Sequence, residues 1–248
     1  MRKTIALLLL LCVAASAFAA DDLTTRIRSS NQMIDDLREL CDRVGGRPTG
    51  SLNEKRAEDW AAKKLRDAGV DVSVESYLIP AYWESKTAMA ACTTPSNFPL
   101  RIAAAPFSAS TPNGEPVEGA LVDFGDGSPA VLAKVPQSLG KIAFVRTPVM
   151  TSLDDLFGDY MRVSALLDTA KRTGVRAMLI ESSQKRSLLY RHPMSLTGRI
   201  VPMPVAVVAR DNAERIIRLL GNGNGNNDIH VRVQLDNEIT GPDRKSVV

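Results

Sequence analysis

The feature that most constrains the fold is a change of pattern near Glu115, after which short apolar runs alternate with amphipathic helical patterns. Strands are predicted for the runs ALVDFG, KIAFVR, RAMLIES, PVAVVAR and IHVRVQL. Strands that alternate with helices in this way are typical of layers packed around one hydrophobic core. The sequence therefore predicts a compact α/β or β-rich domain over residues 115–236, within a chain of mixed α/β (α+β) class.

Two helices are predicted within this region from their apolar spacing and their ends. The first pattern ends at Gly174 and has its apolar positions at Leu156, Tyr160, Val163, Leu167 and Ala170. The second runs from Asp211 to Gly221 and carries Ile216, Ile217 and Leu220. The stretch GNGNGNND follows this helix and precedes a strand, so we interpret it as a flexible connection and not as a dinucleotide-binding loop.

The N-terminal region is predicted to form two helices joined by the corner GGRPTG. An amphipathic helix over 24–44 is indicated by Ile27, Ile34, Leu37, Cys41 and Val44. Ser51 and Glu54 have the spacing of a capping box, which predicts a second helix that ends at Gly69. The expected buried stripe of this helix is Trp60, Ala61, Leu65 and Ala68. Because a helix precedes the glycines, we interpret the corner as a helix-to-helix connection and not as a phosphate cradle.

Extended structure is predicted between the second helix and Glu115. The run VDVSVESYLIP alternates in part and predicts a strand that begins at Val70. Residues 84–105 predict further short extended pieces, interrupted by Pro95 and Pro99. Residues 108–119 are predicted to be a loop, because turn-forming residues occur throughout.

The first twenty residues have the features of a secretory signal peptide, with Arg2 and Lys3, an apolar run and a small-residue cleavage site at Ala17–Phe18–Ala19. Removing them would reduce the 31 basic residues to 29, against 28 acidic ones, so there is no electrostatic case for nucleic-acid binding. No later run reaches the roughly 18 apolar residues of a membrane span. We therefore expect export to the periplasm or the extracellular space, without a membrane anchor.

The mature chain would keep two cysteines, Cys41 and Cys92. In an oxidising compartment these two thiols could form a disulfide. Cys41 also belongs to the apolar face of the helix predicted over 24–44, so a buried free thiol is an equal alternative.

Residues that could carry chemistry are few and scattered. The chain has no HExxH, CxxC, GxSxG or Walker motif. Its two histidines, His192 and His230, lie 38 residues apart and could supply at most two imidazole ligands to a zinc ion. His230 lies in a predicted strand, which favours a structural role. His192 lies in the loop LLYRHP, where a structural role is favoured over a catalytic one.

The acidic pairs and the serine pair also have structural interpretations. Asp123 and Asp126 follow a strand in a turn, and Asp154–Asp155 precede a helix, where carboxylates are favoured by the helix dipole. None of these has the ligand spacing of a calcium loop. Ser182–Ser183 end a strand, where nucleophiles are sometimes placed, but the sequence identifies no base to activate them.

The run VGGRPTGSLNEKRAEDWAAKKLRDAGVDVSVESYLIP resembles the amino-terminal segment of secreted co-catalytic two-zinc aminopeptidases and carboxypeptidases, metallopeptidase family twenty-eight. It contains the G-x-R-x-[TA]-G-S corner of that family and its V-x-x-E strand. The later runs GALVDFGDG, GKIAFVR, LLDTAKRTGVRAMLIES, LLYRHP and IVPMPVAVVARDNAERI resemble the protease-associated domain that is inserted in such enzymes.

The resemblance implies a domain organisation. We expect a signal peptide at 1–20, an incomplete N-terminal segment of a zinc-peptidase domain at 21–114, a protease-associated domain at 115–236 and a truncated start of the remaining peptidase domain at 237–248. The strand around Val72 to Tyr77 would then lack most of its sheet partners, and this part would be poorly ordered or need a partner chain.

The resemblance also bears on metal ions. The family places its metal ligands after the inserted domain, in an H-x-D-S type motif and later acidic and histidine positions, and none of these has a counterpart here. We therefore expect a truncated chain with no catalytic residue, no metal ligand and no cofactor, although two zinc ions are expected in the full-length family.

Two functional hypotheses follow. The first is the non-catalytic N-terminal and protease-associated portion of an exported zinc-dependent exopeptidase, a family that hydrolyses peptides when complete. The second is a free-standing exported module that binds a peptide or a protein. A third, a serine or metal hydrolase with an unrecognised site, lacks an identifiable pair of base and nucleophile. On the proline-bounded loop, Tyr190, Arg191 and His192 are the candidate contacts to substrate.

Overall fold

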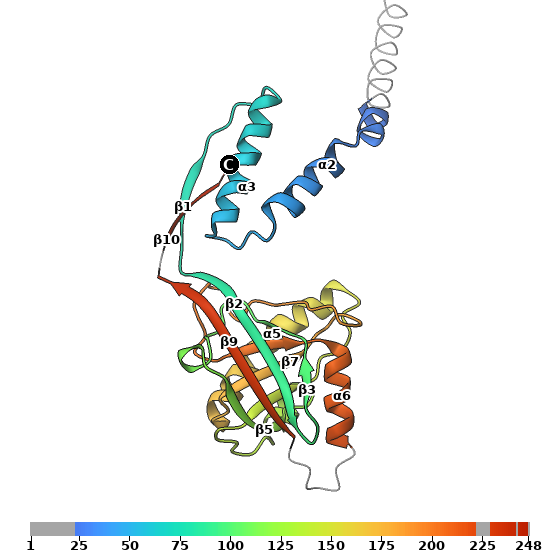
Figure 1. Cartoon of the computed structure of the whole chain (residues 1–248), viewed down its shortest axis with the longest axis vertical. Helices are drawn as coiled ribbons and strands as arrows, with labels where there is room; N and C mark the ends of the chain where they lie inside the picture. The colour runs from blue at the N-terminus through green and yellow to red at the C-terminus, as the bar shows by residue number, and fades with distance from the viewer. Residues whose placement is uncertain (1–22, 222–228, 242, 248) are drawn as a thin grey trace, which may run out of the picture. The chain divides into compact units, whose positions relative to one another are not determined.

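The computed structural model describes residues 23–221, 229–241 and 243–247 (Figure 1). The predicted signal peptide at 1–20 and most of the predicted glycine–asparagine connection lie outside the described residues. The described chain divides into two compact units. The N-terminal unit comprises 23–47 and 52–72, and the sheet unit comprises 48–51 and the residues from Ser73 onward. None of the helices in these described ranges is long and apolar enough for a membrane crossing.

The N-terminal unit is helical, but the helix predicted over 24–44 is interrupted. A helical stretch at 23–29 is followed by α2 (Gln32–Arg38), the π-helix η1 (Glu39–Val44) and α3 (Leu52–Asp67). The predicted apolar face is not buried, because Ile27, Ile34 and Leu37 are 57%, 46% and 55% exposed. The expected stripe on α3 is also partly wrong. Ala62 is buried, Trp60 and Ala61 are half-buried, and Leu65 and Ala68 are exposed.

Ion pairs join the acidic side of α2 and η1 to α3. Lys64 Nζ of α3 lies 2.7 Å from Asp36 Oδ1 of α2 and 3.7 Å from Glu39 Oε2 of η1. The acidic residues of these helices therefore contact α3, whereas Ile34 and Leu37 stay exposed. Solvent screens such exposed ion pairs, so each contributes little to stability.

The GGRPTG corner is confirmed as a helix-to-helix connection, since it joins η1 to α3. The Arg47 side chain donates hydrogen bonds to the carbonyl oxygens of Leu40 and Gly45 at 2.9 and 2.7 Å. The Asn53 side-chain amide donates to the carbonyl of Gly46 at 3.1 Å. Gly45 adopts φ +79°, a conformation that glycine reaches without steric cost. The corner thus satisfies its own backbone groups and those at the end of η1.

Both cysteines are free thiols. Cys41 is exposed, so the interpretation of Cys41 as a buried thiol is wrong. The apolar face to which Cys41 belongs is also exposed. Cys92 is buried, and its Sγ lies 3.1 Å from the carbonyl oxygen of Thr94. Burial raises the pKa of the Cys92 thiol, which disfavours the reactive thiolate.

The sheet unit is built on eight strands in the order β3-β2-β9-β5-β6-β7-β8-β4. Neighbouring pairs from β5 to β8 are parallel, and the other neighbours are antiparallel. The edge strands β3 and β4 are separated by Arg101 alone, and β4 also lies beside β2, so the sheet nearly closes into a barrel. The strand bounds are β2 (Tyr82–Thr94), β3 (Phe98–Leu100), β4 (Ile102–Ala104), β5 (Val117–Asp123), β6 (Ile142–Val145), β7 (Ala177–Glu181), β8 (Val205–Val208) and β9 (His230–Thr240). The mixed α/β class is confirmed.

The five strands predicted after Glu115 are all present, but the earlier strands differ from expectation. Residues 82–94 form the single thirteen-residue strand β2, where short pieces were predicted. Its length follows from antiparallel pairing with β9 along nearly its whole extent. β1 begins at Glu75 and not at Val70, and it pairs with the backbone of β10 (Asp243–Val247) in a separate two-stranded sheet. Among the described residues, β10 is the only strand that pairs with β1.

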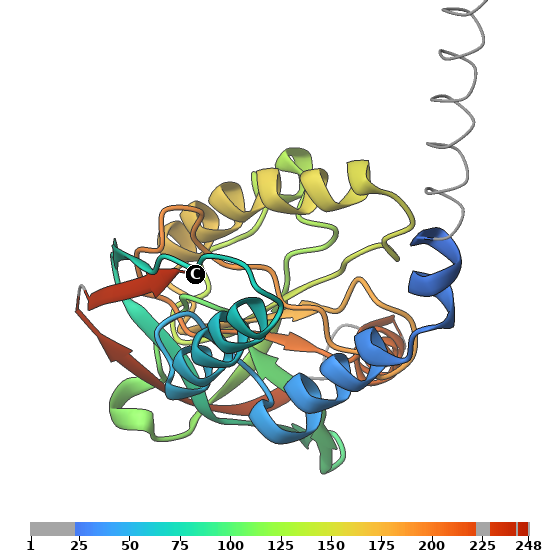
Figure 2. The same ribbon diagram turned by 90° about the horizontal axis from the view of Figure 1, so that it is seen from above.

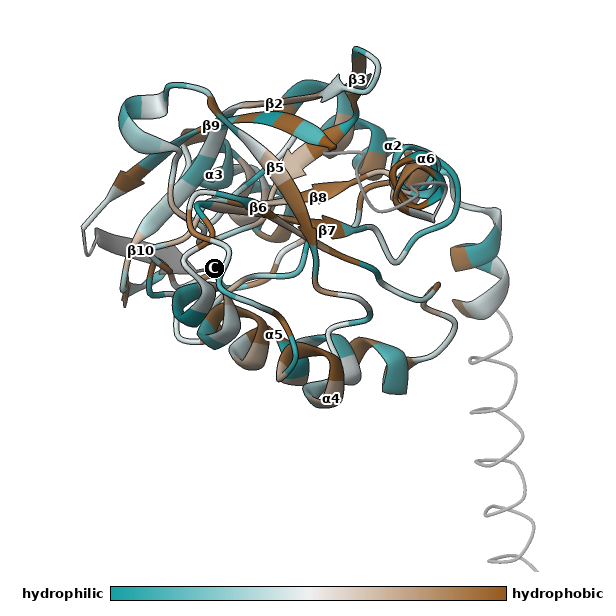
Figure 3. Cartoon of the chain, turned by 90° about the horizontal axis from the view of Figure 1, so that it is seen from below, coloured by the Kyte–Doolittle hydropathy of each residue, from teal (hydrophilic) through white to brown (hydrophobic). Residues whose placement is uncertain are grey.

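Two helices cover opposite faces of the parallel strands. α5 (Leu153–Thr173) runs along one face, and α6 (Arg210–Gly221) lies on the other (Figures 2 and 3). Side chains alternate accordingly: Ile142 and Phe144 of β6 pack in the cluster that holds Ile216 of α6, whereas Val145 packs in the cluster that holds Leu166 of α5. Strands buried on both faces are apolar throughout, which explains the continuous runs in the sequence.

The ends of α5 match the sequence signals. Ser152 caps the helix by accepting a hydrogen bond from the amide of Asp155, and the Asp155 carboxylate accepts from the amide of Ser152. Gly174 ends the helix in the left-handed conformation, as predicted. The two short helical turns are the 3₁₀ helix η2 (Pro112–Gly114) and α4 (Pro129–Leu132).

Two glycine-to-alanine changes should shift stability in opposite directions. Gly158 lies inside α5 with open space around its Cβ position, so Gly158→Ala should raise the free energy of unfolding by about 0.5–1 kcal/mol. Gly119 lies in β5, where a Cβ would lie 2.7 Å from the carbonyl oxygen of Gly140. Gly119→Ala should therefore lower the free energy of unfolding. Urea unfolding of both variants measures the shifts, and equal shifts in one direction would contradict the described packing.

Candidate functional site

Polar side chains gather where the parallel strands β5 to β8 end. Asp123 ends β5, Thr147 follows β6, Glu181 ends β7 and Arg210 follows β8. In α/β sheets, ligands bind preferentially beyond the carboxyl ends of the strands. We call these residues, together with Asp159, Arg162, Ser183 and His192, the carboxyl-edge cluster.

Arg210 links the ends of β6 and β7 through an ion pair and hydrogen bonds. Its Nη1 lies 2.8 Å from Glu181 Oε1, and its Nη2 donates to the carbonyl oxygens of Ser182, at 2.8 Å, and of Thr147. The amide of Thr147 donates to Glu181 Oε2 at 2.9 Å. Burial raises the pKa of the Glu181 carboxyl, and this effect outweighs the opposing hydrogen bond from Thr147 and the charge of Arg210.

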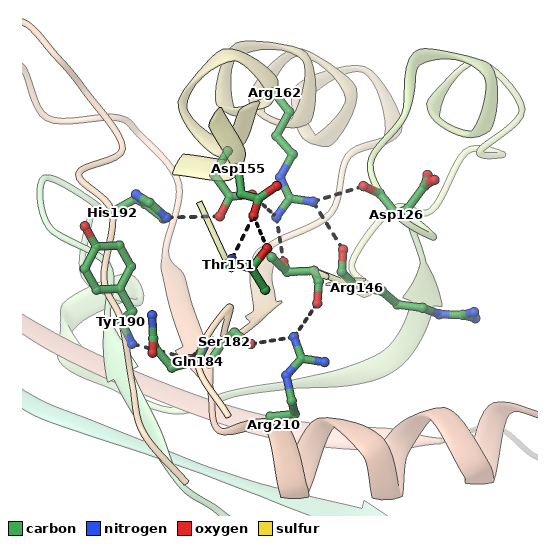
Figure 4. A network of polar contacts seen from close by, with 12 residues as sticks. Asp126, Arg146, Thr151, Asp155, Arg162, Ser182, Gln184, Tyr190, His192 and Arg210 are labelled. Atoms are coloured by element: carbon green, nitrogen blue, oxygen red, sulfur yellow. Dashed lines mark hydrogen bonds and ion pairs between the residues drawn. The ribbon is translucent and has the colours of Figure 1, made fainter. Parts of the chain in front are cut away.

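Arg162 of α5 is the second fixed guanidinium of the cluster (Figure 4). Its Nη1 donates to the carbonyl oxygens of Asp126 and Arg146 at 3.0 and 3.2 Å. Its Nη2 donates to Thr147 Oγ1 at 2.6 Å and lies 3.0 Å from Asp159 Oδ1. Both Nη atoms of Arg162 are thus bound to protein groups. This arginine joins the turns after β5 and β6 to α5, and its two Nη groups are not free to bind an anionic ligand in a bidentate manner.

The predicted substrate-side residues lie on the segment between β7 and β8. His192 turns inward, and its Nε2 lies 3.1 Å from Asp159 Oδ2. The rings of Tyr160 and Tyr190 contact the His192 ring edge to face, with centroids at 4.9 and 4.7 Å. Only 12% of the His192 side chain is exposed, whereas Arg191 is exposed and Tyr190 is half-buried. Of the three residues, Arg191 is therefore the one presented to solvent.

Ser183, His192 and Asp159 line one small cavity, together with Arg162 and apolar side chains. These are the residue types of a hydrolytic triad. The cavity volume is about 20 Å³, however, which is close to the ~10–15 Å³ that one water molecule requires. The cavity is far too small for a peptide bond and its flanking groups. Ser182 is engaged elsewhere, because its hydroxyl donates to the carbonyl of Leu188 and accepts from the amide of Gln184.

Ser182–Ser183 and His192 were predicted separately from the sequence, whereas Asp159 and Arg162 were not predicted. These two residues are three positions apart on α5, and such a charged pair is usual on an exposed helical face. The pair is instead largely buried, with 11% and 17% of the side chains exposed. The contact between His192 and Asp159 spans 33 residues, and no local signal marks it.

The other candidate residues have structural roles. Asp123 Oδ1 accepts from the amide of Gly125, and Asp126 Oδ1 accepts from the amide of Ser128, as expected of turn residues. Asp155 is the N3 residue of the capping box at the start of α5, whose N-cap is Ser152. His230 begins β9, which confirms its predicted position in a strand.

Comparison with known proteins gives a likeness in structure. No family model and no curated protein matches the sequence. The chain is similar to a peptidase M28 precursor from Shewanella amazonensis SB2B, with a TM-score of 0.72 and 22% identity over 92% of this chain and 52% of that one. It is also similar to a zinc aminopeptidase from Bacillus subtilis, with a TM-score of 0.59 and 20% identity over 84% of this chain and 44% of that one.

A third likeness is to an aminopeptidase from Aneurinibacillus sp. strain AM-1, with a TM-score of 0.54 and 15% identity. It covers 86% of this chain and 46% of that one. At these identities the likeness establishes the fold alone. The chain has the mixed α/β fold found in part of these M28-type peptidase and aminopeptidase structures, and it spans about half of their length.

Replacing Arg162 tests whether the carboxyl-edge cluster stabilises the fold. Arg162→Ala should lower the free energy of unfolding by roughly 3 kcal/mol, because it removes the cation that pairs with the largely buried Asp159 and the donor to Thr147 and to two carbonyl groups. The control Arg191→Ala removes an exposed arginine and should change stability by no more than about 0.5 kcal/mol. Urea unfolding measures both, and equal effects would show that the cluster contributes no special stability.

Proposed function

We propose that the chain is the non-catalytic N-terminal and protease-associated portion of an exported zinc-dependent exopeptidase. The observation that carries this proposal is the fold likeness, which extends over 84–92% of the chain to structures named as an M28 peptidase and a zinc aminopeptidase. The GGRPTGS corner and the motifs within 115–236 support it independently. Export, peptide hydrolysis and the assignment of 115–236 as a protease-associated domain all belong to this proposal.

The described residues do not fit a two-zinc site. Within 23–221, 229–241 and 243–247, no group of three or more His, Cys, Asp or Glu side chains is placed to hold a metal ion. A catalytic zinc ion needs about three protein ligands of these kinds, and its second shell must orient them. We therefore derive no hydrolytic step from these residues. In the proposed whole enzyme, other residues would hold the zinc ions.

We further propose that the loop Tyr190, Arg191 and His192 faces substrate in that enzyme. The support for this proposal is that the loop presents an exposed arginine next to a histidine that is held in place. Arg191 is exposed, while His192 beside it is held by Asp159 and by two aromatic rings. An arginine on a pre-organised loop loses less conformational entropy when it binds a carboxylate. The loop would therefore favour acidic groups on a peptide.

Purified chain should not hydrolyse aminoacyl p-nitroanilides in the presence of Zn²⁺, because the described residues supply no ligand cluster. Chromogenic assays with and without a chelator measure this directly. Turnover that a chelator abolishes and zinc restores would overturn the assignment of a non-catalytic portion. A chain carrying His192→Ala serves as the control, since loss of turnover in this variant would trace any activity to the carboxyl-edge cluster.

The alternative, a free-standing module that binds peptide or protein, makes a different prediction. The exposed Ile27, Ile34 and Leu37 fit both proposals, since exposed apolar side chains often mark a surface that another protein covers. Titration of the chain with a fluorescently labelled acidic peptide separates the two. One exposed arginine attracts a carboxylate only weakly by itself, so our first proposal predicts no saturable change in anisotropy for this chain alone. Saturable binding that Arg191→Ala weakens and the exposed control Arg199→Ala leaves unchanged would favour the module.

A further inference from the structure

Two buried polar atoms of the carboxyl-edge cluster have no hydrogen-bond partner among the described residues, and both belong to residues that line one cavity. They are Ser183 Oγ and His192 Nδ1, and both side chains line the cavity of about 20 Å³. Ser183 is only 3% exposed. A buried polar group that lacks a partner costs free energy, so native proteins rarely leave one unmatched.

The contact with Asp159 places a hydrogen on Nε2 of His192. A carboxylate can only accept hydrogen bonds, so the His192 Nε2 that lies 3.1 Å from Asp159 Oδ2 must carry the hydrogen. In the neutral imidazole, Nδ1 then has a lone pair and acts as an acceptor. The Ser183 hydroxyl can both donate and accept. Each of the two atoms therefore lacks a partner, and one small molecule that can both donate and accept could match both.

The size and lining of the cavity decide what that molecule is. A volume of about 20 Å³ exceeds the ~10–15 Å³ needed for one water and does not extend to a larger molecule. The charged groups around it are already engaged, since Arg162 binds Thr147 and Asp159, and Glu181 binds Arg210. Apart from Tyr190, the rest of the lining is apolar, from Val163, Leu166, Ile180, Met194 and Val207.

We propose that this cavity is a binding site for one ordered water molecule, which donates to His192 Nδ1 and pairs with Ser183 Oγ. The water joins the end of β7 to the segment 184–200, which contains no helix or strand. Together with the contact between His192 and Asp159, it fastens that segment to the sheet on one side and to α5 on the other. The serine and histidine therefore serve as a water-mediated clamp on the Arg191 loop and not as a nucleophile and its base.

A crystal structure of the exported chain at high resolution tests the site. We expect one water peak within hydrogen-bond distance of both Ser183 Oγ and His192 Nδ1. In solution, ¹⁵N NMR should show the His192 tautomer with hydrogen on Nε2, and a long-lived water cross-peak to the ring. Ser183→Ala should lose that cross-peak, whereas the exposed control Ser164→Ala should keep it.

Three results would overturn the proposal. One is a direct hydrogen bond between Ser183 Oγ and His192 Nδ1 with no water between them. Another is the tautomer with hydrogen on Nδ1, which removes the acceptor. The third is labelling of Ser183 by a fluorophosphonate probe, which requires access for a substrate-sized molecule. If Ser183→Ala fails to fold, the crystal structure and the tautomer of the unmodified chain still decide the question.

Discussion

Burial of the parallel strands on both faces is the constraint on which the rest of the sheet unit depends. Every residue of β6, β7 and β8 is buried, because α5 packs on one side and α6 on the other. Charged side chains are therefore confined to the strand ends, and the buried Glu181 is paired with Arg210 and accepts a hydrogen bond from the amide of Thr147. The position of the candidate site follows from this packing, because polar groups can reach water or each other only at that edge.

The sequence predicts the fold well where a short stretch of residues indicates by itself which side chains are buried or where a helix begins and ends. The runs KIAFVR and PVAVVAR are apolar throughout because both faces are covered, and α5 carries its own cap at Ser152 and its stop at Gly174. Residues 82–94 were harder, because the alanine-rich stretch of β2 has little intrinsic strand preference and is held by pairing with β9. Helical spacing over 24–44 identified an apolar face but could not say whether another surface covers it.

The candidate site could be predicted only in part. The loop LLYRHP was recognisable from its proline and its polar side chains, and it contributes His192 to the carboxyl-edge cluster, with the Tyr190 ring in contact with it. Asp159 and Arg162 could not be found, because a charged pair on a helix usually faces solvent, and only the packing of α5 against the strand ends buries it. Distant partners of this kind are fixed by tertiary structure. The side chains of Asp159 and Arg162 form hydrogen bonds and ion pairs that hold turns and loops in place. We assign the cluster a structural role on this basis.

The central claim is that the described residues form a scaffold and do not themselves hold the metal ions of a peptidase. Anomalous diffraction at the zinc edge, from crystals of this chain soaked in Zn²⁺, tests that claim most directly. The account predicts no pair of zinc peaks bound by side chains of this chain. Two peaks about 3.5–4 Å apart, the spacing of two-metal sites, with His, Asp or Glu ligands from this chain alone, would contradict it.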